Sequence, residues 1–149
     1  MPSSIWNQPL ESLYDGLAAP KSAPAAVTAS AVSARFGLAL LIKVLEVTIR
    51  RKTFSGDPAQ FQAMIEAARA ESAKLAQAAD DDTNAGSDRR RSEIPMLAAQ
   101  AAEAGLAQCV SARTFITGPL VADLEAAILL LDAARRAILV CEESNERGR

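Results

Sequence analysis

The sequence predicts an all-α protein, a single-domain bundle of about five antiparallel helices that spans 1–149. Half of the 149 residues are hydrophobic, whereas only 4% are aromatic. Much of the apolar content is alanine, which favours closely packed helices over a sheet. A chain of this length can bury a real hydrophobic core as one domain.

Helical spacing of apolar residues and helix-ending residues place the first three helices. The first is expected over 7–18, with Pro20 beyond its end. The second, over about 25–52, is apolar around most of its circumference, which is typical of a central, buried helix. The third begins at Pro58, with Asp57 as its N-cap.

A polar connection follows the third helix. The segment 80–91, DDDTNAGSDRRR, is highly charged and has no period, so we expect a flexible loop. Its arginines are either an anion-binding patch or solvated charge. The fourth helix is expected to begin between Ser92 and Pro95, with Ser92 as the candidate N-cap, and to run to about Ala112.

The last helix is expected after the break TFITGP. Pro119 opens it, and it ends near Glu143. The remaining tail, 144–149, is expected to fray.

The charge pattern argues against several classes of partner. A net charge of −2 gives no general attraction to nucleic acid or to an anionic membrane. Arg35, Lys43 and Glu46 interrupt the longest apolar run, so it falls short of the roughly 18 uncharged residues of a membrane span. The first residues lack a basic start followed by an apolar core, so we expect a cytoplasmic protein rather than a secreted one.

The residues available for chemistry are few. Cys109 and Cys141 are the only cysteines and there is no histidine, which excludes an ordinary zinc site and a Cys–His nucleophile pair. We therefore expect no metal. No glycine-rich phosphate loop is present either. What remains for catalysis is a carboxylate that acts as a general acid or base.

Two carboxylates are candidates. Asp123 is expected on the core-facing side of the fifth helix, and it is either a functional acid or a first-turn acid that favours the positive helix end. Glu71 lies at the edge of the apolar stripe of the third helix, as a rim charge or as part of a site.

Polar side chains of the second helix gather within about 80° of one another, at roughly 100° per residue. They are Thr28, Arg35, Lys43, Glu46 and Arg50. Such a stripe is either a solvated face or the wall of a polar site. Lys43 and Glu46, spaced i to i+3, are also suited to a simple ion pair.

Two motifs carry a resemblance. The first motif lies between residues 24 and 54. It begins with a proline and continues with an alanine-rich helix that contains a glycine, a Thr-Ile step, a basic cluster and an aromatic residue. In this order the residues are Pro24, Gly37, Thr48, Ile49, Arg51, Lys52 and Phe54. Later, Asp123 precedes a leucine in an alanine/leucine-rich helix. Both motifs resemble the cyclodeaminase/cyclohydrolase family of all-helical folate enzymes. At the positions where that family has three glycines and a serine, residues 25–28 of this chain are Ala-Ala-Val-Thr.

The resemblance implies folate-linked one-carbon metabolism, with a tetrahydrofolate derivative as the substrate. The activity would be that of a cyclohydrolase on methenyl-tetrahydrofolate or of a cyclodeaminase, an ammonia lyase, on formimino-tetrahydrofolate. Asp123 would be the catalytic acid/base, and Thr28, Lys43, Arg50 and Glu71 would bind the substrate. A homodimer is also implied. The alternative is a catalytically inactive, diverged member that serves as a helical binding or partner subunit, which the loss of the glycines favours.

Overall fold

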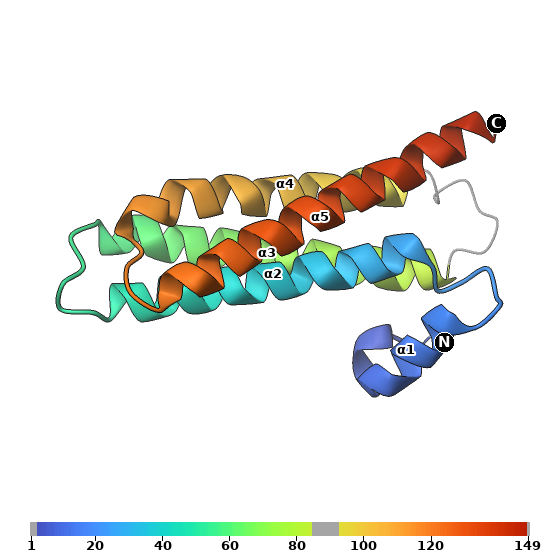
Figure 1. The fold of residues 1–149 in the computed structure, drawn as a ribbon, viewed down its shortest axis with the longest axis horizontal. Coiled ribbons are helices and arrows are strands. Elements are labelled where there is room, and N and C mark those ends of the chain that lie inside the picture. Colours follow the sequence, from blue (N-terminus) through green and yellow to red (C-terminus); the bar gives the residue numbers. More distant parts are fainter. Residues whose placement is uncertain (1–2, 85–92, 149) are drawn as a thin grey trace.

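The computed structural model describes residues 3–84 and 93–148, and every regular element in these ranges is a helix. Four long helices lie side by side and antiparallel, while a short one stands beside the end at which α2 begins (Figure 1). The elements are η1 (Ile5–Asn7), α1 (Leu10–Ala18), α2 (Ala26–Ile49), α3 (Pro58–Asn84), α4 (Glu93–Ala112), η3 (Arg113–Phe115) and α5 (Leu120–Arg147). The all-α class predicted from composition is confirmed.

The four long helices form a ring in which each packs mainly on two of the others. Helix α2 contacts both α3 and α5, and α4 contacts both as well. The core inside this ring includes the fully buried Leu38, Leu41, Leu45, Ile65 and Leu131. Antiparallel neighbours need only short connections. None of the described helices combines the length and the apolar content needed to cross a membrane.

Two glycines let the helices approach closely. A Cβ at Gly37 of α2 would lie 2.9 Å from Cγ of Leu131 on α5. A Cβ at Gly105 of α4 would lie 2.6 Å from Cδ2 of Leu38 on α2. Real Cβ atoms do not come this near to other carbons, so both helix contacts depend on the missing side chain.

The expected central position of the second helix is wrong. Helix α2 is one side of the ring, and its outer surface exposes Phe36 and Val47. The polar stripe does not form a single face either, because Thr28 is fully buried while Lys43 is exposed. A helix on one side of a bundle can bury one apolar face, here with Leu38, Leu41 and Leu45, and still carry large apolar residues on its outer side.

Helix α3 extends past its expected end. The loop was expected from residue 80, but 80–84 are helical. Partners on other segments bind two of the acids there: Ser4 Oγ donates to Asp80 Oδ2 at 2.7 Å, and Thr28 Oγ1 donates to Asp82 Oδ2 at 2.9 Å. These bonds offset the cost of adjacent carboxylates in a helix. The rest of the expected loop and the candidate cap Ser92 lie outside the described residues.

The other helix ends agree more closely with expectation. Asp57 Oδ1 accepts a hydrogen bond from the Ala59 backbone at 3.0 Å, which confirms the cap of α3. Helix α5 continues four residues past Glu143, to Arg147, so the described part of the tail is helical. The backbone N–H of Gly148 caps this end by donating to Ser144 O at 3.2 Å.

The N-terminal segment is tied to the bundle beside the start of α2. The Ile5 backbone donates to Asp80 Oδ1 at 2.8 Å, and the Trp6 indole donates to Ala76 O at 3.0 Å. The guanidinium of Arg35 lies 4.2 Å from the centre of the Trp6 ring. These contacts with α2 and α3 hold a segment that buries little apolar surface of its own.

Candidate functional site

The line of contact between α2 and α5, which we call the α2–α5 seam, contains the first candidate. Lys43 Nζ of α2 lies 2.7 Å from Asp123 Oδ2 of α5, and the two side chains are 57% and 32% exposed. Asp123 therefore does not face the core, contrary to expectation; it reaches across the seam to a cation. The tertiary contact joins residues that are 80 positions apart.

The remaining charges of the stripe form other pairs. Glu46 lies between Arg50 and Arg69, with N–O distances of 3.3 and 3.4 Å. Glu71 pairs with Lys74 of its own helix at 3.0 Å. Arg50 and Glu71 are thus in surface pairs, and the single chain brings neither into a cavity with Asp123.

Thr28 lies at the other end of the seam. Its hydroxyl donates to the buried Asp82 carboxylate and lies 3.1 Å from the hydroxyl of Thr83. Thr28 and Lys43 are separated by 15 residues of one helix, which is about 22 Å along its axis. Within one chain, then, Thr28 and Asp123 do not line a common cavity.

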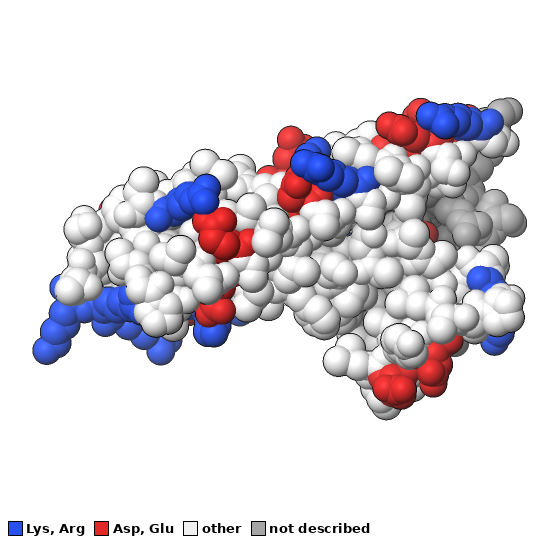
Figure 2. Space-filling model, viewed as in Figure 1, with Lys and Arg blue, Asp and Glu red and all other residues white. Residues whose placement is uncertain are grey.

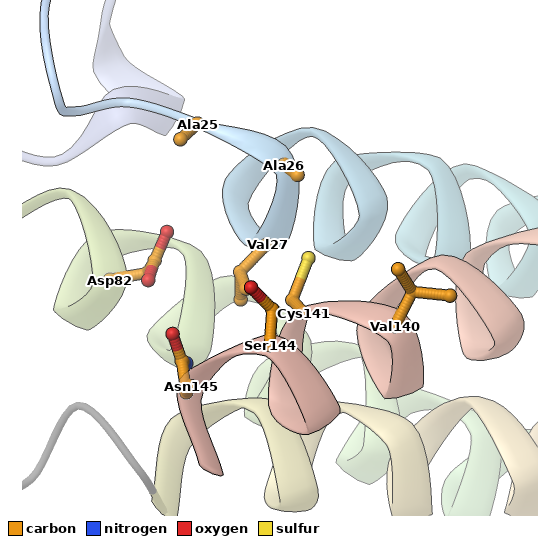
Figure 3. Close-up of a pocket in the computed structure, with 8 residues that line it drawn as sticks. All are labelled: Ala25, Ala26, Val27, Asp82, Val140, Cys141, Ser144 and Asn145. Carbon is orange, nitrogen blue, oxygen red and sulfur yellow. The ribbon is translucent and has the colours of Figure 1, made fainter. Parts of the chain in front are cut away.

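A pocket of about 310 Å³ opens beside Thr28, and we call it the α2-start pocket. Side chains from the start of α2, the end of α3 and the last turns of α5 converge on it (Figure 3). Its lining residues are Ala25, Ala26, Val27, Asp82, Val140, Cys141, Ser144 and Asn145. This volume is at the lower end of the range of small-molecule sites, about 300–1,000 Å³.

The electrostatics of this pocket depend on Asp82 and on the first turn of α2. Burial raises the pKa of the Cys141 thiol, and the nearby charge of Asp82 raises it further. Helix α2 begins without a side-chain cap at Ala25. The first backbone N–H groups of a helix have no partner within it, so they favour a hydrogen-bond acceptor at this position. The pocket thus offers backbone donors, a carboxylate and a protonated thiol.

Sequence reasoning missed three of the polar residues that line the pocket. Asp82 was assigned to a loop, and Ser144 and Asn145 to a frayed tail. A signal for Asp82 was present, because it continues the helical spacing of the buried Leu75 and Ala79. The other cysteine, Cys109, is a core residue, and burial raises its pKa to about 12. Within 3–84 and 93–148, no cluster of three or more Cys, Asp or Glu side chains could hold a metal ion.

The structure is thus an antiparallel four-helix bundle with a pocket at the start of α2. The family model described as formiminotransferase-cyclodeaminase matches residues 9–89, more than half of the chain. The chain belongs to the formiminotransferase-cyclodeaminase family, as the motifs between 24 and 54 indicated.

A solved structure has the same fold. The crystal structure of formiminotetrahydrofolate cyclodeaminase from Thermotoga maritima superposes with a TM-score of 0.88 at 18% sequence identity. The match covers 97% of this chain and 81% of the Thermotoga chain. No curated protein matches the sequence.

Proposed function

We propose that this protein binds a one-carbon derivative of tetrahydrofolate and acts on it as a cyclohydrolase or a cyclodeaminase, in a site shared by two subunits. Family membership and the fold of the Thermotoga cyclodeaminase support the choice of ligand. The observation that carries the proposal is the Lys43–Asp123 pair, a partly exposed carboxylate held by a cation across the α2–α5 seam.

Asp123 is suited to proton transfer. Lys43 contacts only Oδ2, and Oδ1 has no hydrogen-bond partner among the described residues. That free oxygen would accept a proton from water that adds to a methenyl carbon, or return one to a departing nitrogen. Lys43 would hold the carboxylate in place during either reaction.

A two-fold axis would bring this pair to the α2-start pocket of a second subunit. Phe36, midway between Thr28 and Lys43 on α2, is 47% exposed, and Leu130 of α5 is exposed close to Gly37. Uncharged surface covers most of this face (Figure 2). An axis perpendicular to α2 near Phe36 would place Lys43 and Asp123 of one subunit beside residue 28 of the other.

The other proposed site residues have smaller roles in this arrangement. Thr28 is fully buried, so it would position Asp82 rather than touch the ligand. Arg50 is exposed two turns beyond Lys43, within reach of the carboxylates of a folate. Glu71 lies on α3 with Lys74 and has no part in the shared site.

The second candidate function is that of a catalytically inactive binding or partner subunit. It is supported by the side chains at the start of α2, since Ala25, Ala26 and Val27 all line the pocket. Methyl groups here restrict the approach of a planar ligand to the backbone N–H groups. A member of this kind would keep the dimer and the pocket but would not turn over substrate.

Two assays separate these functions. Turnover is measured as the loss of the absorbance of methenyl-tetrahydrofolate. Binding is measured as a change in the fluorescence of Trp6, the only tryptophan. We expect Asp123→Asn to lower turnover by about 100-fold or more while saturable binding persists. Asp132→Asn is the control, because it removes the same charge from α5 where Asp132 pairs with Arg135 and Arg136.

The outcomes are distinct. Turnover that Asp123→Asn abolishes and Asp132→Asn preserves supports the enzyme. Binding without turnover in the unmodified protein supports the inactive subunit. Turnover that is equal in the unmodified protein and in Asp123→Asn would contradict the role of Asp123.

A further inference from the structure

We propose that the end of the bundle opposite the α2-start pocket binds a small oxyanion, through a phosphate or a carboxylate group. A second pocket, of about 150 Å³, lies here where α2 ends, and we call it the α2-end pocket. Its volume is at least ten times the roughly 10–15 Å³ that a single water needs. The site does not depend on the proposed folate function.

Hydroxyl groups and one guanidinium make up the polar lining. Thr48, Arg51, Thr53, Ser55, Thr114 and Thr117 contribute them. Thr48 already donates to Val44 O at 2.6 Å, so its proton is not available. The hydroxyls of Thr53, Ser55 and Thr114 have no partner within the described residues. Several neutral donors around one cation are the groups that recognise an oxyanion.

Arg51 has an unusual position among the described arginines. Arg35 stacks on Trp6. The six other described arginines each lie within 4 Å of a carboxylate oxygen; they are Arg50, Arg69, Arg113, Arg135, Arg136 and Arg147. Arg51 has no acidic partner in the described part of the chain. One terminal nitrogen, Nη1, donates to Thr117 O at 3.0 Å and to Thr117 Oγ1 at 3.3 Å. Its other nitrogens retain donors for a ligand.

The surrounding charge favours an anion. Lys and Arg gather over the end of the bundle where α2 ends (Figure 2), and Arg50, Arg51 and Lys52 are consecutive there. No carboxylate lines the pocket. Of the nearby acids, Asp57 caps α3 and Glu125 pairs with Arg113. The net local charge is therefore positive, and an anion would be attracted.

Aromatic packing makes the walls rigid. Phe54, Phe61 and Phe115 form a cluster with ring centroids 4.8, 5.4 and 6.1 Å apart, and it ties the α2–α3 loop and the first turn of α3 to η3. Gly118, at φ 66°, makes the turn that presents Thr117 to Arg51. Donors fixed in this way lose little entropy when an anion binds.

Calorimetric titration with inorganic phosphate and, separately, with glutarate tests the proposal at low ionic strength. We expect saturable binding of at least one of them, weakened tenfold or more in Arg51→Gln. Lys52→Gln is the matched control, because it removes the same charge one residue away, outside the pocket lining. Tighter binding of phosphate would indicate a phosphate source, and tighter binding of glutarate an organic acid.

Arg51 also bridges two loops, so Arg51→Gln can lose stability. Ser55→Ala, on an exposed loop residue, provides a second variant, and we expect it to weaken binding several-fold. The proposal is overturned if neither anion binds at tens of millimolar, or if both variants bind as the unmodified protein does. Equal loss in Lys52→Gln and Arg51→Gln would also overturn the proposal, because it would indicate general charge attraction.

Discussion

The Thr28 hydroxyl donates a hydrogen bond to the carboxylate of Asp82, 54 residues further along the chain, at 2.9 Å. Both side chains are buried, and together they join the start of α2 to the last turn of α3. This bond closes the end of the bundle on which the α2-start pocket lies.

Asp82→Ala should therefore destabilise the fold. The Thr28 hydroxyl would lose its buried acceptor, which costs about 1–3 kcal/mol in the free energy of unfolding. Urea unfolding, monitored by circular dichroism, measures this free energy. Asp81→Ala is the control, because Asp81 is exposed and bonds only Gln77 among the described residues, and we expect a change of less than about 0.5 kcal/mol there. Equal effects of the two variants would contradict a buried role for Asp82.

Asp82→Asn should make Cys141 more reactive. The pKa of this thiol is raised first by burial and then by the charge of Asp82. Removing the charge lowers the pKa, so the thiolate fraction at a given pH rises. The pH profile of alkylation by iodoacetamide, read by mass spectrometry, should move to lower pH. Asp81→Asn should leave the profile in place, and Cys109, fully buried, should stay unlabelled in both variants.

Gly105→Ala should destabilise the protein although alanine favours helices. The added methyl would lie 2.6 Å from Cδ2 of Leu38, and overpacking of this kind costs about 1–3 kcal/mol. Gly16→Ala in α1 is the control, because the new Cβ would come no closer than 3.4 Å to Pro24. The melting temperature should fall in Gly105→Ala and should not fall in Gly16→Ala. The reverse order would contradict the close contact of α4 with α2.

Phe36→Glu should separate the proposed dimer into monomers. A charge near the two-fold axis would face its own copy, which is unfavourable in an apolar interface. Leu129→Glu is the control, because Leu129 is 70% exposed on α5 and lies about 200° around that helix from Ala127, whose carbonyl approaches Gly37 of α2. Light scattering after gel filtration gives the mass of each variant. A dimer that survives Phe36→Glu and dissociates with Leu129→Glu would place the interface elsewhere.

Mixed subunits would test whether the site is shared. Ala26→Trp should block the α2-start pocket from an exposed position, while Asp123→Asn removes the proposed acid/base. Each variant alone should be inactive. After mixing by reversible unfolding, about a quarter of all sites would combine an open pocket with an intact Asp123, given random C2 pairing. Recovery of turnover to that level supports the shared site, and no recovery contradicts it.

Most of the helices were predictable because their signals are local. The cap of α3 at Asp57 and the prolines near helix starts act within one or two turns. The family followed from motifs of the same kind, confined to residues 24–54 and to the step at Asp123. Where local signals misled, at residues 80–84, partners from distant segments stabilised a helix that its own charges disfavour.

The site depended on contacts that no local pattern reveals. Asp123 was expected to face the core, but it reaches Lys43 across the seam. Asp82 was assigned to a flexible loop, but it lies buried in α3 against Thr28. The spacing predicted a helical position for Asp123 but not for Asp82, and in both cases the partner was determined by which helices pack together.

The amino-acid sequence by itself determined that the chain is helical, where most helices begin and end, and which family it resembles, because these follow from interactions a few residues apart. Only the tertiary structure decided that Lys43 pairs with Asp123, that Thr28 is buried with Asp82, and that Arg51 has no carboxylate partner among the described residues. Such pairings join residues 54 to 80 positions apart. They arise when apolar helix faces pack and bring whatever polar groups flank them into contact.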